Sequence, residues 1–298
     1  MIPSSNLPPM ATTVSFLFWN IRRAQGTRFF ESLRRLAGRG IDVFIFAEPP
    51  EDDAKLLGAI GSGSGEKYYR VPSESKRLKL FSCLSDCDWA DRFSGDLSSR
   101  ITAHELTVTN HPSILLIGAH LHDPMRHSSE DRAEWARKLA VQIRQLERDA
   151  DHARTILVGD LNMNPFDQGL VATTGLHALM TSSLTLSVQR MKSRREHRPF
   201  YNPMWSLLGD RLGRELQLRL VSGTYFHDNS QALASPFWQM FDQVLLQYDL
   251  IQSLVRLEIL ESDGQDLLIS RSGRPRREAI SDHLPLSFDI MLPKSGGS

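Results

Sequence analysis

The sequence predicts an α/β fold, and three observations support this class. Short apolar runs have the length and composition of buried strands, and the clearest cover residues 14–19, 41–47, 113–119 and 155–158. Segments with helical spacing separate them, at residues 28–38 and 128–150. The 298 residues show no repeat at a fixed period and no Pro- or Gly-rich linker, so we expect one domain over residues 14–292.

The first strand, the helix after it and the second strand have clear ends. The first strand is expected to end at Asn20, and Gly38 provides a stop for the helix. The second strand ends at Glu48, because Pro49 and Pro50 carry no amide hydrogen for a sheet ladder.

The middle of the chain is expected to contain a meander and then a long helix. The meander strands are predicted at residues 68–71, 78–84 and 100–108. The strand at residues 113–119 ends at His120, and Ser128 and Asp131 resemble a capping box that starts the helix. The predicted buried face of this helix contains Trp135, Leu139, Ile143 and Leu146.

The last third of the chain is harder to assign. Residues 176–220 are polar, basic and weakly periodic, so no element is predicted there, and residues 181–222 are expected to form a basic insertion. The last strand is expected to place Ser287 and Asp289 on its wetter face. Strands are predicted at residues 241–246, 254–260 and 284–291, with disorder over residues 1–13 and a flexible tail at residues 293–298.

A polar stretch, Gly159-Asp160-Leu161-Asn162-Met163-Asn164-Pro165, follows the strand at residues 155–158. Side chains alternate along extended backbone, so Asp160 and Asn162 are expected to point the same way. Asn164 before Pro165 is predicted to be a helix N-cap followed by a first-turn proline. The alternative is a polar turn without a chemical role, because Gly, Asn and Asp are common in turns.

The composition is that of an ordinary globular protein. Hydrophobic residues make up 41% and charged residues 23%, and 35 basic side chains balance 35 acidic ones, which argues against a bulk-basic nucleic-acid binder. Cys83 and Cys87 have no second cysteine pair with which to complete a zinc site. No apolar run approaches the ~20 residues of a membrane span. Residues 1–13 lack the features of a signal peptide, so a cytoplasmic enzyme is expected.

Four predicted strands end in a residue suited to binding or catalysis: Asn20, Glu48, His120 and Asp160. Such residues concentrate where a rigid sheet meets its loops. Mg²⁺ prefers oxygen ligands and usually takes one or two carboxylates, which makes Glu48 a candidate ligand. The alternative for Glu48 is a solvated carboxylate at a strand end.

Asp282 and His283 precede the last predicted strand. This pair could supply a metal-side carboxylate and an imidazole that contacts phosphate. Asp242 lies in an apolar strand, where a buried carboxylate needs a partner, and is the candidate that holds the tautomer of His283. On its own, an aspartate in a strand is more often an edge or capping residue.

Six motifs, in this order, resemble the endonuclease/exonuclease/phosphatase superfamily, which includes DNase I-like and exonuclease III-like enzymes. They are Trp19-Asn20-Ile21, Ala47-Glu48, His120-Leu121, Gly159-Asp160-Leu161-Asn162, Phe241-Asp242 and Ser281-Asp282-His283. Gly223-Thr224-Tyr225 resembles a further segment of that family, and the resemblance covers residues 14–290. It implies a four-layer α/β sandwich, with two mixed β-sheets face to face and helices outside, and metal-dependent hydrolysis of a phosphoester.

The resemblance also implies a role for each motif residue. Glu48 would bind the catalytic Mg²⁺ or Mn²⁺ with Asn20 beside it, and Asp282 would complete the acidic cluster on the metal side. Asp160 would orient or deprotonate the attacking water, and Asn162 would position the water and the phosphate. His120 and His283 would stabilise the transition state, and Asp242 would orient His283.

This sequence differs from the usual pattern of the superfamily at two of the six motifs. Ala47 stands where many members carry Gln, and His120-Leu121 stands where AP endonucleases carry a tyrosine-containing motif. The second departure argues against specificity for abasic sites and favours the His-Leu branch, which spans DNase-like enzymes and lipid or sugar phosphatases. No phosphate-recognition motif of the 5-phosphatases is recognised around the Asn and His segments.

Two basic runs in loop-like sequence favour nucleic acid as the substrate. They contain Arg190, Lys192, Arg194, Arg195 and Arg198, and Arg271, Arg274, Arg276 and Arg277. Arg and Lys neutralise backbone phosphates, and nearby aromatic side chains could stack on bases. The predicted substrate-binding residues are Arg194, Arg195, Tyr201, Arg274 and Arg276. The alternative is a solvated basic surface with the aromatic residues in the core.

The sequence therefore predicts a monomeric, metal-dependent nuclease that cleaves DNA or RNA by in-line attack of an activated water. Two alternatives remain open. One is a phosphatase or a phospholipase-like phosphodiesterase that acts on a small or lipid phosphoester, and the other is an inactive binding module with the same fold.

Overall fold

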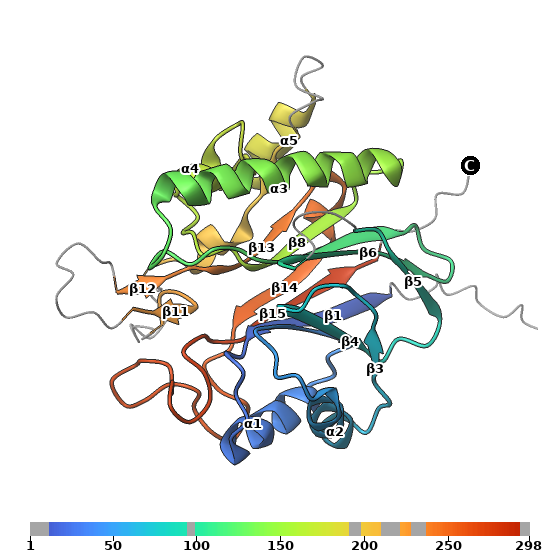
Figure 1. Cartoon of the computed structure of the whole chain (residues 1–298). Helices are drawn as coiled ribbons and strands as arrows, with labels where there is room; N and C mark the ends of the chain where they lie inside the picture. Colours follow the sequence, from blue (N-terminus) through green and yellow to red (C-terminus); the bar gives the residue numbers. More distant parts are fainter. Residues whose placement is uncertain (1–11, 94–98, 191–197, 210–220, 228–236, 293–298) are drawn as a thin grey trace, which may run out of the picture.

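The computed structural model describes residues 12–93, 99–190, 198–209, 221–227 and 237–292, which form four layers (Figure 1). Two β-sheets pack face to face in the middle. Helices α1 (Thr27–Ala37) and α2 (Asp53–Ser64) cover the outer face of one sheet. The other sheet is covered by α3 (Ser129–Asp149), α4 (Gln168–Val171) and α5 (Ser182–Arg190). The predicted four-layer α/β sandwich is confirmed.

The first sheet has six strands. In chain order they are β1 (Thr13–Asn20), β2 (Val43–Ala47), β3 (Tyr69–Val71), β4 (Leu78–Ser82), β14 (Leu254–Ile259) and β15 (Leu286–Met291). Their spatial order is β14-β15-β1-β2-β4-β3, and only β1 and β2 are parallel neighbours.

The second sheet has seven strands in the order β5-β6-β7-β8-β13-β10-β9. In chain order they are β5 (Cys87–Asp91), β6 (Ile101–Val108), β7 (Ile114–His120), β8 (Thr155–Asp160), β9 (Ala178–Leu179), β10 (Phe200–Tyr201) and β13 (Asp242–Leu246). A separate hairpin consists of β11 (Tyr225–Phe226) and β12 (Trp238–Gln239), and two 3₁₀ helices are η2 (Pro203–Leu207) and η3 (Tyr248–Ser253).

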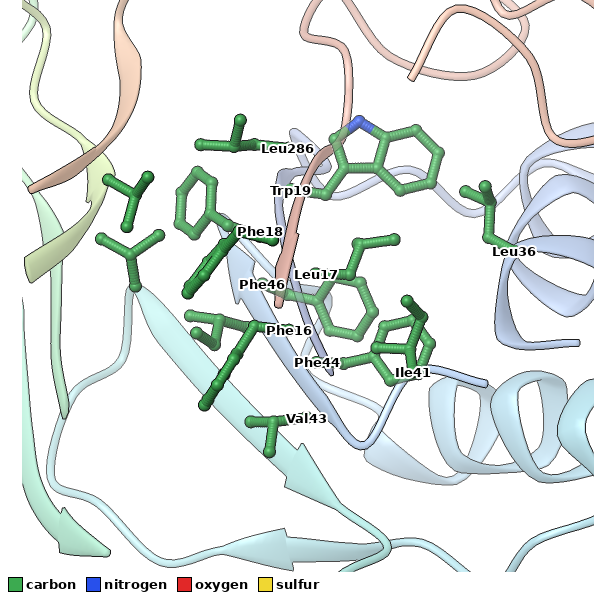
Figure 2. Packing of buried hydrophobic residues seen from close by; sticks show 14 of the residues in the cluster. Phe16, Leu17, Phe18, Trp19, Leu36, Ile41, Val43, Phe44, Phe46 and Leu286 are labelled. Carbon is green, nitrogen blue, oxygen red and sulfur yellow. The ribbon is translucent and has the colours of Figure 1, made fainter. Parts of the chain in front are cut away.

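Alternating side chains of β1 fill two regions of the core (Figure 2). Phe16 and Phe18 point toward the second sheet, whereas Leu17 and Trp19 point toward the helices. The Trp19 ring lies 5.3 Å from that of Phe29 on α1. Burying a side chain of this size stabilises the fold by about 1.5–3 kcal/mol, so β1 is anchored to both neighbouring layers.

Strand register brings the predicted site residues to one edge of the sandwich. The parallel pair β1 and β2 sets Asn20 beside Ala47, and Glu48 follows directly. The parallel pair β7 and β8 sets His120 beside Asp160, and the antiparallel strand β13 sets Asp242 on the other side of Asp160. Polar ends of strands that are far apart in the sequence therefore meet.

One prediction about the strands is wrong. The meander does not exist as one unit, because β3 and β4 belong to the six-stranded sheet and β6 belongs to the seven-stranded sheet with the unpredicted strand β5. Ser287 and Asp289 do lie on the more exposed face of β15, although Ser287 itself is buried, and Asp289 pairs with Arg256 at 2.7 Å. Local patterns do not contain sheet membership, which depends on long-range pairing.

Two helix starts were predicted from capping signals, and only one is correct. Ser128 and Asp131 form the predicted capping box at the start of α3. Asn164 caps no helix, because α4 begins at Gln168 after Asp167. The Asn164 side chain instead accepts a hydrogen bond from the Met240 amide at 2.9 Å and so ties the loop after β8 to the start of β13.

We predict that Glu147 lowers the stability of the fold at high pH. This residue of α3 is 7% exposed, and burial raises its pKa to about 7 from a reference of 4.5, although the Thr155 hydroxyl donates to it at 2.8 Å. The folded state holds the proton more tightly than the unfolded state, so stability is greatest below the unfolded pKa and falls as the pH rises through the folded value.

Glu147→Gln keeps the acceptor for Thr155 and removes the charge. We expect it to raise the free energy of unfolding by about 2–3 kcal/mol near pH 8 and by much less near pH 4.5. Urea unfolding at the two pH values measures this difference. Equal stabilisation at both pH values would contradict the prediction.

No helix in the described ranges combines the length and the apolar character needed to cross a membrane.

Candidate active site

Seven polar residues predicted for the site line one cavity of about 680 Å³. The hairpin strand β11 borders this cavity through Tyr225. Asp242, the eighth predicted residue, has no exposed surface and is hydrogen-bonded to one of the seven. The seven are Asn20, Glu48, His120, Asp160, Asn162, Asp282 and His283. The structure therefore brings together all the residues that the motifs assign to metal binding and catalysis.

Asp160 connects the members of this group. Its Oδ2 accepts a hydrogen bond from Asn20 Nδ2 at 2.9 Å, and its Oδ1 accepts one from the Asn162 amide at 3.0 Å. The Nε2 atoms of His120 and His283 lie 3.7 and 4.0 Å from Oδ2. Burial raises the pKa of Asp160 to about 7, although the charge of His283 opposes the shift. Near neutral pH, this carboxylate is suited to accept a proton.

His283 is held by a buried carboxylate. Its Nδ1 lies 2.7 Å from Asp242 Oδ2, and Nδ1 is the donor because an ionised carboxylate only accepts. Burial disfavours the charged imidazole, but the negative charges of Asp242 and Asp160 outweigh it and raise the pKa of His283 to about 10. The structure thus makes His283 a cation at neutral pH.

His120 has the opposite charge state. Burial, together with the positive charges of Arg77 and Arg100, lowers its pKa to about 3. The 3.5 Å contact between its Nε2 and Glu48 Oε1 is therefore a polar contact of a neutral ring and not an ion pair. One neutral and one cationic imidazole lie beside the same Asp160 carboxylate.

Backbone strain concentrates around the cavity. In the part of the chain that the structure describes, four lining residues other than glycine have positive φ: Arg22 at 44°, Arg23 at 54°, Glu48 at 48° and Asn162 at 51°. Each such conformation costs about 1–2 kcal/mol and persists only where neighbouring contacts determine it. The prediction of extended backbone at Asn162 is therefore wrong, although its side chain still lines the same cavity as Asp160.

The oxygen atoms near Glu48 fit a hard divalent cation. The Glu48 side chain is 33% exposed, and its Oε1 lies 3.5 Å from His120 Nε2. Oδ1 of Asp282 is buried and has no hydrogen-bond partner within the described ranges. The side-chain oxygen of Asn20 accepts from the Arg22 amide at 3.1 Å. A cation that takes one or two carboxylates and keeps other positions for water or phosphate matches this donor set.

A different group of ionisable side chains has the spacing of metal ligands. One ligand atom each from Asp160, Asp242 and His283 lies within 4.8 Å of the others. We assign this group to hydrogen bonding, because Asp242 is fully buried and already engages His283 Nδ1. Hard cations prefer oxygen to imidazole nitrogen, which also favours the Glu48 side of the cavity.

Arginines make the cavity attractive to anions. Arg22 pairs with Asp282 at 3.0 Å, and Arg277 lies 3.8 Å from the same carboxylate. Arg100 donates to the carbonyl oxygens of His120 and Leu121 at 3.2 and 3.3 Å, which fixes its guanidinium at the cavity wall. Arg100 forms no ion pair with a carboxylate of the described residues, so its charge is available to a bound anion.

The three predicted substrate-binding residues that the structure describes do not line this cavity. Tyr201, Arg274 and Arg276 are absent from its lining. Arg274 instead stacks on the Phe226 ring, and Arg276 donates to the Ile269 carbonyl. Arg194 and Arg195 fall outside the described residues. A role in substrate binding stays a prediction for all five.

Sequence reasoning missed the arginines that line the cavity. Arg22 follows Asn20 by two positions, so its place in a motif was a usable signal. Arg277 belongs to a basic run next to Asp282 but was not chosen from that run. Arg77 and Arg100 lie in separate loops, and nothing in their local sequence indicates that they meet.

The sequence matches no protein-family model and no curated protein. Solved structures match nearly the whole chain. An endonuclease/exonuclease/phosphatase family protein from Bacteroides thetaiotaomicron is 15% identical with a TM-score of 0.55, over 94% of this chain and 95% of that one. TDP2 from D. rerio, complexed with single strand DNA product, is 14% identical with a TM-score of 0.54, over 93% and 98%.

The endonuclease domain of TRAS1, a telomere-specific non-LTR retrotransposon, is 13% identical with a TM-score of 0.51, over 95% of this chain and 100% of that domain. At these identities, the likeness concerns the fold. The fold expected from the six motifs is confirmed, and the chain has the fold of endonuclease/exonuclease/phosphatase proteins.

Proposed function

We propose that this protein is a divalent-metal-dependent phosphodiesterase that hydrolyses nucleic acid. The observation that carries the proposal is the position of Asp160 beside one neutral and one cationic imidazole, in a cavity that also contains Glu48 and several arginines. A general base, a cation site and fixed positive charge are the three components that phosphoryl transfer requires.

Glu48, Asn20 and Asp282 would hold Mg²⁺ or Mn²⁺. A bound cation of this kind polarises a phosphoryl oxygen and neutralises charge that develops on it. The fit rests on the exposed Glu48 carboxylate and on the unpartnered Oδ1 of Asp282 described above.

The other residues act directly on the water and the phosphate. Asp160 accepts a proton from the attacking water. The side-chain amide of Asn20 and the backbone amide of Asn162 hold the two carboxylate oxygens of Asp160 in place. Asn162 is anchored by donation from its Nδ2 to the Leu121 carbonyl at 3.1 Å, which leaves its side-chain oxygen for a water. His283 donates from Nε2 to a phosphoryl oxygen as a cation, and Asp242 keeps it charged.

Nucleic acid is the substrate class that the surroundings of the cavity favour. A chain of phosphodiesters offers charge on both sides of the cleaved bond, and guanidinium groups from different loops line this cavity. Two proteins with the same fold are an endonuclease domain and a protein complexed with single strand DNA product. These similarities support the proposal, and the basic runs in the sequence agree with it.

A substrate panel tests the proposed function. We expect the purified protein to cleave DNA or RNA with Mg²⁺ or Mn²⁺, to lose activity in EDTA, and to bind nucleic acid more weakly as salt rises. Preferential hydrolysis of a lipid or small phosphoester would identify one of the alternative enzymes. Binding of nucleic acid without any hydrolysis would identify an inactive module.

A further inference from the structure

Lys79 is a buried lysine whose charge is fully engaged by one short segment. It lies on β4 with 7% of its surface exposed. Its ammonium donates to the Pro50 carbonyl at 2.7 Å, to the Glu51 carbonyl at 2.9 Å and to the Asp53 carboxylate. An ammonium has three donors, so each of them finds an acceptor, as burial of a charge requires.

Two of the three acceptors lie just after Glu48, in the connection from β2 to α2, and the third, Asp53, is the first residue of α2. Pro49 and Pro50 have no amide hydrogen, so this connection cannot be tied to the sheet by backbone donors at those positions. Lys79 instead ties the connection to the sheet in the opposite direction, because its ammonium donates to carbonyl oxygens of the connection. Its partner across the ladder is Phe46, so the lysine reaches along the end of β2 to the segment that follows Glu48.

Glu48 needs such support because its backbone is left-handed. Its φ is 48°, a conformation that side-chain-bearing residues rarely adopt. On the strand side, the Glu48 amide donates to the Arg77 carbonyl at 2.9 Å, and the Glu48 carbonyl accepts from the Arg23 amide at 2.7 Å. On the other side, Lys79 and Arg70 bind residues 50–53 to the sheet, and Arg70 contacts Asp53 alone.

We propose that Lys79 is a positioning residue that keeps Glu48 in this strained conformation, with its carboxylate presented to the cavity. The inference rests on the proposed function, in which Glu48 holds the divalent cation. Residues that orient a metal ligand affect the metal nearly as strongly as the ligand does. Lys79 touches no cavity space itself, so it acts only through the segment that it holds.

The test compares Lys79→Met with Arg70→Met. Both variants remove a cation bound to Asp53, but only the first also frees the two backbone carbonyls. Hydrogen exchange of the Glu48 amide, measured by NMR, reports the local backbone. Mn²⁺ binding, measured by calorimetry without substrate, reports the cation site. If Lys79→Met does not fold, Lys79→Gln, which keeps an amide donor, takes its place.

We expect Lys79→Met to speed exchange of the Glu48 amide by about tenfold or more and to weaken Mn²⁺ binding by about 10- to 100-fold. Arg70→Met should leave both within about twofold of the wild type. Unchanged Glu48 exchange in a folded Lys79 variant would overturn the inference, as would equal effects of the two substitutions. A wild-type protein that binds no Mn²⁺ would refute the proposed function, while the exchange experiment would still decide the role of Lys79.

Discussion

Replacement of Asp160 by asparagine is expected to reduce kcat by about 10²- to 10⁴-fold, the usual contribution of a positioned general base. The substitution preserves the shape of the side chain and the Oδ1 acceptor for the Asn162 amide. It removes the ability to accept a proton from water. The new Nδ2 group also cannot accept the hydrogen bond from Asn20 Nδ2, and the negative charge that helps to raise the pKa of His283 is lost. Substrate and metal binding should change much less than kcat, because neither relies on proton transfer.

The matched control is Asp289→Asn. Asp289 lies on β15 and pairs with Arg256, outside the cavity lining, so the same chemical change there should leave hydrolysis intact. Thermal unfolding of both variants separates loss of fold from loss of chemistry. Wild-type kcat in a folded Asp160→Asn protein would rule out the role assigned to this carboxylate.

The polar ends of strands could be predicted from the sequence because their signal is local. A run of buried residues that stops at Asn20, His120 or Asp160 indicates both the strand and its last residue, and the run before Glu48 indicates a strand that ends one residue earlier, at Ala47. The order of the motifs then indicated the fold. What local sequence does not contain is the register, and register is the reason that these four ends meet.

The failures have a common physical origin in long-range contacts. Asn164 has the local features of a helix cap, but its side chain bonds to a residue 76 positions away. The ion pair of Arg22 and Asp282 joins residues 260 positions apart, and Arg77 reaches the cavity from a loop with no distinctive pattern. The strand β5 was missed because its residues are partly exposed and lack an apolar run.

The charge states of the two histidines follow from the same kind of contact. Sequence reasoning gave His120 and His283 the same role, as groups that stabilise the transition state. The structure places His120 near two arginines and His283 against a buried aspartate, so their pKa values move in opposite directions. Only the second ring is a cation near neutral pH, whereas the first is neutral.

Replacement of Glu48 by glutamine is expected to weaken Mn²⁺ binding and to reduce activity by about 10²- to 10³-fold at limiting metal, because a charged oxygen ligand is worth several kcal/mol to such a site. Glutamine has the same length and keeps an oxygen for the contact with His120. The substitution leaves unchanged the main-chain hydrogen bonds of this residue and the contacts of Lys79 with the segment that follows it. Saturating metal should therefore restore part of the activity.

Glu51→Gln is the control for this experiment, since Glu51 lies three residues further along the same connection and outside the cavity lining. Its backbone carbonyl still accepts from Lys79 in the variant. Calorimetry with Mn²⁺ and titration of activity with metal measure the difference between the two variants. We expect a higher half-saturating metal concentration for Glu48→Gln and an unchanged one for Glu51→Gln. If both variants bind Mn²⁺ like the wild type, the cation site does not include Glu48. Retained binding would then favour the buried Asp160, Asp242 and His283 group, whose ligand atoms lie within 4.8 Å of one another.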